Sequence, residues 1–186
     1  MTLGHSFDTT LLGARQGAES AWAAIYRDLA PAVLGYFRAR RAVEPQDLVA
    51  EVFLHVVRDL GSFEGGEREF RAWVFTIAHH RLLDDHRRRG SRPVEPAPDE
   101  ALLAVEPEGH AVEDALARRL GDEEVRRLIG LLSADQQAVL LLRIVGDLTV
   151  EQVARVTGKR PGAVKALQRR GLAAIKRELA RQGVPL

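Results

Sequence analysis

Apolar residues recur along this chain at intervals of three and four, the spacing that places them on one face of an α-helix. Two stripes of this kind are formed by Leu48, Val52, Phe53, Val56, Val57 and Leu60, and by Phe70, Trp73, Val74, Ile77 and Leu82. Alternating β-branched runs, which indicate strands, are almost absent. We therefore predict an all-α fold, with helices near residues 17–40 (interrupted near Pro31), 45–60, 68–88, 112–131, 134–145, 149–156 and 160–181.

The last two predicted helices are joined in the manner of a helix-turn-helix. Thr149 and Gln152 fit a capping box, in which each side chain satisfies a backbone N–H at the helix start. Gly158 supplies the turn, and Pro161 suits the first turn of the next helix because its missing N–H costs nothing there. The residues expected to face inward on that helix are Val164, Leu167, Gly171, Ile175 and Leu179.

The opposite side of the last predicted helix is basic. Lys165, Arg169 and Lys176 lie there, and Arg170 and Arg177 flank them. In a helix-turn-helix, the exposed face of the second helix enters the major groove of DNA. A solvated basic helix on an ordinary helical protein has the same local pattern, so the basic face alone leaves both interpretations open.

The net charge of +1 hides a strong segregation of charge along the chain. Residues 93–114 contain seven acidic residues and no lysine or arginine, whereas residues 155–181 contain nine basic residues and one acidic residue. The acidic segment also contains several prolines, which disfavour a helix. We predict an N-terminal helical domain at residues 1–89, a flexible acidic linker at 90–111 and a C-terminal helical domain at 112–186, with the two domains free to reorient.

Composition excludes several classes of protein. The chain has no cysteine, which excludes disulfides, cysteine-ligated zinc and a thiol nucleophile. The first residues lack the pattern of a signal peptide, and apolar runs such as Ala138–Leu142 are far shorter than the ~20 residues that span a bilayer. We expect a cytoplasmic protein that does not insert into a membrane. Because no phosphate-binding glycine loop, nucleophile elbow or carboxylate dyad is found, we expect no cofactor and no enzymatic activity.

Three motifs of the chain, taken in order, carry a family resemblance. DLVAEVFLHVV, FRAWVFTIA and, after the acidic segment, LSADQQAVLLLRIVGDLTVEQVARVTGKRPGAVKALQRRGLAAIKREL resemble the extracytoplasmic-function group of bacterial sigma factors over about residues 14–180. The resemblance implies a sigma region 2-like bundle and a sigma region 4-like helix-turn-helix. It also implies three partners: core RNA polymerase, through its β′ clamp helices and β flap; promoter DNA; and an anti-sigma factor.

The same resemblance implies roles for individual residues, by analogy alone. Docking on polymerase is assigned to Asp47, Leu48, Glu51 and His55. The loop 61–69 and the helix after it are assigned to melting the minus-ten element and capturing an everted base, with contacts from Phe63, Phe75, His79, His80, Arg87, Arg88 and Arg89. Reading of the minus-thirty-five element is assigned to Lys159, Arg160, Lys165, Ala166, Arg169 and Arg170.

Local pattern also sorts the aromatic residues of the N-terminal half. Phe70 and Trp73 are expected to be core residues, whereas Phe63 and Phe75 are expected nearer an exposed loop and outer face. Aromatic side chains beside positive charge suit unstacked bases and a phosphate backbone. In the minus-ten region this chain has His79 where the family commonly has arginine, followed by a second histidine in place of asparagine.

Other interpretations of the same residues lead to other classes of protein. Asp47 and Glu51 fit an ordinary solvated helix face, and a second hypothesis is an autonomous two-domain helix-turn-helix regulator that binds duplex DNA without polymerase. His80 and Asp84 share a helix face at the i, i+4 spacing of metal ligands, with His79 and His86 nearby, so a metal-dependent phosphohydrolase is a third hypothesis. Metal content and binding to polymerase separate these classes.

Overall fold

The computed structural model describes residues 4–90 and 123–183, and within these ranges every regular element is helical. The elements are a 3₁₀ turn at Gly4–Ser6, α1 (Phe7–Arg15), α2 (Glu19–Ala39), α3 (Pro45–Asp59), a 3₁₀ turn at Leu60–Ser62, α4 (Glu67–Arg88), α6 (Glu123–Gly130), α7 (Ala134–Ile144), α8 (Val150–Thr157) and α9 (Pro161–Arg181). The all-α prediction is confirmed. The predicted linker beyond residue 90, and residues 112–122 of the predicted helix 112–131, lie outside the described residues.

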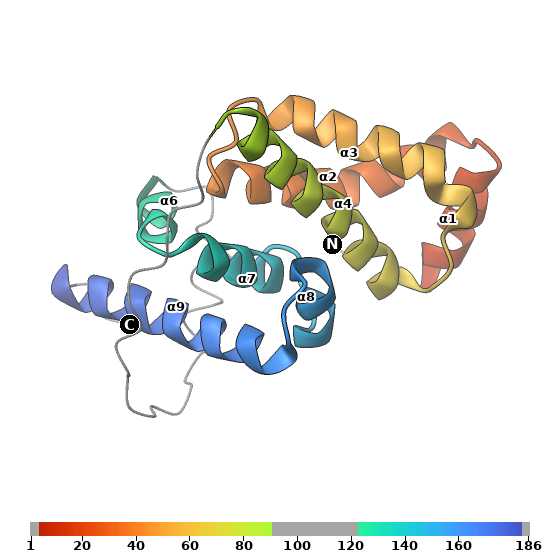
Figure 1. Ribbon diagram of the computed structural model, residues 1–186. Helices are drawn as coiled ribbons and strands as arrows, with labels where there is room; N and C mark the ends of the chain where they lie inside the picture. Colours follow the sequence, from red (N-terminus) through yellow and green to blue (C-terminus); the bar gives the residue numbers. More distant parts are fainter. Residues whose placement is uncertain (1–3, 91–122, 184–186) are drawn as a thin grey trace.

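Helices α1 to α4 form one bundle (Figure 1). Its centre contains Ile25, Val33 and Tyr36 of α2, which pack with the buried faces of α3 and α4. The predicted interruption at Pro31 is wrong, because α2 runs unbroken from Glu19 to Ala39 and its buried residues continue on both sides of the proline. Tertiary packing of that apolar face outweighs the one hydrogen bond that proline removes.

The sequence analysis missed α1, a helix of nine residues. Phe7, Leu11 and Ala14 form its buried face, and the ring of Phe7 lies 5.6 Å from that of Phe70 in α4. The apolar pattern of α1 consists of only these three residues. They are too few to indicate a helix without the bundle against which they pack. Helix α1 therefore gains its stability from tertiary contacts.

Helix α3 follows its predicted stripe with one exception. Leu48, Val52 and Val56 are buried, but Val57 is 52% exposed and Val49 takes the inward position instead. Successive residues of a helix are rotated by about 100°, so Val57 points away from the buried face to which Val56 belongs. The prediction that Val57 faces inward is wrong.

Helices α8 and α9 form the helix-turn-helix predicted from the sequence, and α7 packs against both. Thr149 Oγ1 accepts the N–H of Gln152, whose side chain in return accepts the N–H of Thr149, as a capping box requires. Gly158 takes the left-handed conformation (φ 67°) between α8 and α9, where a side chain would be strained. On α9, Val164, Gly171 and Ile175 are buried, and Leu167 and Leu179 pack at the edge of the core.

The two halves of the described chain are in contact, chiefly where α4 meets α8 (Figure 1). Arg71 of α4 donates from Nε to the carbonyl of Gly146, 2.7 Å away, and from Nη2 to that of Val145, 3.3 Å away. Gln152 donates from Nε2 to the carbonyl of Arg68, at 3.2 Å. The predicted division at residues 89 and 112 stays a prediction; in this arrangement the halves share an interface.

Candidate functional site

The first candidate surface is the outer face of α3. Asp47 is exposed, and Glu51 and His55 are half-buried because Arg81 of α4 lies beside them, 4.0 Å from the Glu51 carboxylate and 3.3 Å from His55 Nδ1. His55 Nε2 also pairs with Asp59 at 3.0 Å. Leu48, assigned to the same surface, is only 4% exposed and belongs to the core, so its assignment to docking is corrected.

The outer face of α3 carries an apolar component that the sequence analysis missed. Leu54 is 70% exposed and lies two turns after Asp47, and Val57 is 52% exposed and follows Leu54 at the i, i+3 spacing. Large aliphatic side chains exposed side by side are typical of a binding surface. The signal was present in the sequence, since α3 has more apolar residues than one buried face can hold.

Two of the aromatic residues assigned to DNA are in the core, contrary to prediction. Phe63 is 8% exposed, with its ring stacked on Trp73 at 5.3 Å, and Phe75 is fully buried. Phe75 meets the ring of Tyr36 edge to face at 6.0 Å, in a geometry that aromatic pairs favour. The expectation that these two side chains are exposed is wrong, while Phe70 is buried as expected.

His79 is also buried, contrary to its assignment to DNA. It is 6% exposed, and its Nδ1 shares a hydrogen bond of 2.8 Å with the hydroxyl of Tyr36. Burial, together with the positive charge of Arg40, lowers the pKa of His79 to about 4, so the ring is neutral at pH 7. Burial likewise raises the pKa of Tyr36 to about 12. His80, on the next position of α4, is exposed and is the histidine that a ligand can reach.

The arginines at the end of α4 are largely paired with carboxylates. Arg87 donates to Asp84 at 3.0 Å, and Arg89 donates to Asp85 at 2.8 Å and lies 3.7 Å from Glu44. Arg88 is exposed. Two of the three arginines assigned to the minus-ten element are therefore partly neutralised by neighbours, so binding an anion there requires these ion pairs to rearrange.

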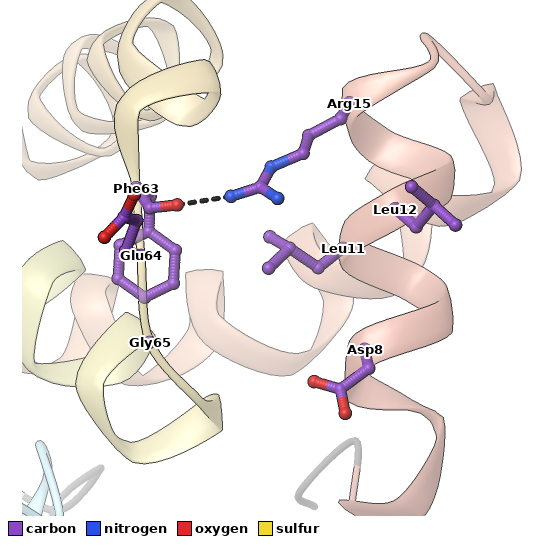
Figure 2. Close-up of a pocket in the computed structure, with 7 residues that line it drawn as sticks. All are labelled: Asp8, Leu11, Leu12, Arg15, Phe63, Glu64 and Gly65. Carbon is purple, nitrogen blue, oxygen red and sulfur yellow. Dashed lines mark hydrogen bonds between the residues drawn. The ribbon is translucent and has the colours of Figure 1, made fainter.

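An open pocket of about 420 Å³ lies between the loop before α4 and helix α1 (Figure 2). Asp8, Leu11, Leu12 and Arg15 line it from α1, and Phe63, Glu64 and Gly65 line it from the loop. The side chain of Arg15 donates to the Phe63 carbonyl across the cavity, as Figure 2 shows. The sequence analysis identified the loop but not the residues of α1 that face it.

The basic face of α9 is accessible. Lys165 and Arg169 are exposed, as is Arg160 just before the helix, and Ala166 and Arg170 are half-buried. Lys159 differs from the prediction, because its ammonium group is held by Asp135 of α7 at 2.6 Å. The helix-turn-helix thus exposes Lys165 and Arg169 on α9 and Arg160 just before it.

Two further observations concern the described part of the chain. Within residues 4–90 and 123–183, no helix is both long and apolar enough to cross a bilayer. In the same ranges, no three histidine, aspartate or glutamate side chains come together in a way that could hold a metal ion. The face shared by His80 and Asp84 thus lacks a third ligand among the described residues.

Comparisons with known proteins agree on one family. Residues 25–92 match the family model described as Sigma-70 region 2, and residues 122–175 match Sigma-70, region 4. The chain is 29% identical to the ECF RNA polymerase sigma factor SigD of Mycobacterium tuberculosis, over 97% of this chain and 87% of that protein. It is 32% identical to the ECF RNA polymerase sigma factor BldN of Streptomyces coelicolor, over 89% of this chain and 63% of that protein.

Solved structures share the fold. The structure of CnrH in complex with the cytosolic domain of CnrY superposes with a TM-score of 0.64 and 22% identity, covering 93% of this chain and 96% of that one. The sigma factor RpoE of Bartonella quintana, solved with the anti-sigma factor NepR, gives a TM-score of 0.61 and 18% identity, covering 85% and 96% of the two chains.

Proposed function

Because this chain belongs to the extracytoplasmic-function group of the sigma-70 family and is an RNA polymerase sigma factor, we propose that its separate surfaces divide the work of promoter recognition. Helix α3 docks on the clamp helices of the polymerase β′ subunit, and the helix-turn-helix reads the minus-thirty-five element beside the β flap. One observation carries this proposal: the same chain has two exposed faces of different chemistry. The face on α3 has carboxylates and exposed aliphatic side chains, and the face on α9 is basic.

At the minus-thirty-five element, Arg169 reads bases and Lys165 positions the helix. An arginine offers two donors that match O6 and N7 of guanine, and each such pair contributes ~1–3 kcal/mol of discrimination. A lysine on a phosphate adds affinity that does not depend on sequence. Both side chains are exposed on α9 and need no rearrangement of the core to reach a groove.

At the minus-ten element, the cavity between α1 and the loop 63–65 holds an everted base. Leu11 and Phe63 supply apolar walls, and the carboxylates of Asp8 and Glu64 are acceptors for the exocyclic amine of a base. Exposed His80 and Arg88 lie on the same helix, α4, that follows the loop. The buried Phe63 and Phe75 support this site from the core and do not stack on DNA.

The two halves separate when the protein engages a promoter. The minus-ten and minus-thirty-five elements lie ~25 base pairs apart on the promoter. That separation is ~85 Å of duplex at 3.4 Å per base pair. Helix α9, with 21 residues, is about 32 Å long, and α8 touches α4. Contacts such as that of Arg71 with Gly146 must therefore break before both elements are bound.

We further propose that an anti-sigma factor controls this protein, as NepR binds the related RpoE. An inhibitor that binds across both halves would hold them close together and keep α3 from polymerase. The site of action is the cytoplasm, where polymerase meets DNA.

The test is transcription from a promoter library by purified core polymerase with and without the full chain. We expect defined start sites only when the chain is present. Asp47→Arg combined with Glu51→Arg should abolish co-purification with polymerase while helicity stays intact. The matched control, Glu19→Arg with Glu124→Arg, reverses two exposed carboxylates elsewhere and should leave binding unchanged. Tight sequence-specific DNA binding without polymerase, and no transcription with it, would support an autonomous regulator instead.

A further inference from the structure

A second cavity, of about 280 Å³, lies between the start of α3 and the end of α4. Four carboxylates line it, those of Glu44, Asp47, Glu51 and Asp85, together with two guanidinium groups, those of Arg88 and Arg89. Leu48 forms its apolar floor. Carboxylates outnumber cations two to one, so the cavity has the polarity of a site for a positively charged group.

Asp85 sets this cavity apart from an ordinary acidic surface. The residue is 5% exposed, and its Oδ1 accepts a hydrogen bond from Arg89 Nε at 2.8 Å. Its Oδ2 is buried and has no hydrogen-bond partner among residues 4–90 and 123–183. Buried carboxylate oxygens nearly always have a donor, because leaving one without a partner costs free energy. The Oδ2 of Asp85 therefore marks a place for a hydrogen-bond donor from outside the described residues.

The chemistry of the cavity selects the kind of donor. The described residues bring no three acidic or histidine side chains together in metal-binding geometry, which favours a larger cationic group over a bare metal ion. A basic side chain brings both positive charge and directed N–H donors. Arginine suits the cavity better than lysine, because its planar, weakly hydrated fork can bond to Asp85 and to a second carboxylate at once.

We infer that this cavity is the socket for one arginine side chain of the polymerase surface on which α3 docks, with Asp85 Oδ2 as its buried acceptor. The inference rests on the proposed docking function and adds a residue from α4 to it. The socket adjoins the proposed docking surface, since Asp47 and Glu51 belong to both. An arginine seated there would be held from α3 and α4 together, which fixes the register of docking.

The first experiment compares two neighbouring carboxylates. Asp85→Asn keeps an oxygen for Arg89 and replaces the lone acceptor with an N–H₂ donor, whereas the control Asp84→Asn changes a more exposed carboxylate on the same helix. We expect Asp85→Asn to lower the affinity of the full chain for core polymerase about tenfold or more, and Asp84→Asn to change it less than twofold. Equal affinities of wild type and Asp85→Asn would overturn the socket and leave the docking proposal standing. Failure of the wild-type chain to bind polymerase would overturn both.

A second measurement does not depend on the stability of Asp85→Asn. Because the chain has no cysteine, Glu44→Cys provides a single position at the rim of the cavity for a photoactivatable cross-linker. We expect the cross-link to map to a polymerase segment that contains an arginine. Changing that arginine to alanine should weaken binding to wild type but not further weaken binding to Asp85→Asn. A cross-link to a segment without basic residues, or additive effects of the two changes, would refute the pairing.

Discussion

Arg71 is the side chain whose removal should most directly loosen the contact between the two halves. It is mostly buried, with 18% of its side chain exposed, and it reaches from α4 to the carbonyls of Gly146 and Val145. Its Nη1 also lies 3.8 Å from the buried carboxylate of Asp28. We predict that Arg71→Ala shifts the protein toward an arrangement in which the halves are apart.

The size of the effect follows from the contacts. A hydrogen bond that involves a charged group contributes ~1.5–3 kcal/mol. The bond to Gly146, at 2.7 Å, is strong, while the one to Val145, at 3.3 Å, is long and the approach to Asp28 exceeds hydrogen-bond distance. The bond to Gly146 therefore accounts for most of the effect, and Arg71→Ala should weaken the contact between the halves by about 2 kcal/mol. That change raises the ratio of open to closed molecules about 30-fold.

Single-molecule energy transfer between dyes at Ser20→Cys and Ala180→Cys reports this ratio, since both positions are exposed and the chain has no other cysteine. Arg68→Ala is the matched control. Arg68 contributes its backbone carbonyl to the interface, as the acceptor of Gln152 Nε2, and its own side chain is exposed. We expect the population with low energy transfer to grow in Arg71→Ala and to stay at the wild-type level in Arg68→Ala.

A second readout is the carboxyl of Asp28. Burial raises its pKa, and the positive charge of Arg71 opposes that rise. In Arg71→Ala the pKa of Asp28 should rise further, which a titration followed by NMR would detect. Identical transfer distributions for wild type and Arg71→Ala, or equal shifts for the Arg71 and Arg68 variants, would refute the assigned role.

Three other changes test the remaining parts of the structure. Arg169→Ala should cost ~1–3 kcal/mol on promoters with the preferred upstream base and little on others, measured by competition binding of the polymerase complex; an equal loss on every sequence would mean a phosphate contact. Because the pKa of His79 is lowered from 6.5 to about 4, the unfolded chain takes up a proton first as pH falls. Stability should drop by about 3 kcal/mol between pH 7 and 4, and urea titration of His79→Gln should lack that part of the pH dependence. Gly171→Ala would place a Cβ 2.8 Å from Leu140 Cδ1 and should lower stability by ~1–3 kcal/mol, whereas Gly162→Ala, on the same helix in open space, should not; thermal unfolding of both variants decides.

Much of the fold was predictable because its signals are local. Capping at Thr149, the turn at Gly158 and the proline that opens α9 lie within a few residues of the structure that they determine. The buried stripes of α3 and α4 follow from helical spacing in the same way. The accessible part of the candidate site, the basic face of α9 with Lys165 and Arg169, was found by the same reasoning.

The errors share a physical cause. Phe63, Phe75 and His79 each lie on or beside a helix that has more apolar and aromatic residues than one face can bury, so spacing alone does not say which of them the neighbouring helices cover. The buried bond of His79 is to Tyr36, 43 residues away in the chain. Helix α1 was missed because its three buried residues form too short a pattern to predict a helix, and only the bundle shows that they are buried.

The amino-acid sequence by itself determined the helical class, the helix-turn-helix and the family, since each depends on short-range spacing or on motifs in order. Tertiary structure alone decided which side chains are accessible and how the halves meet. Arg71 and Gly146, for example, are 75 residues apart, and their bond exists only once both halves have folded. Local free energies select helices, whereas burial and pairing between distant segments select the surfaces that remain for DNA and polymerase.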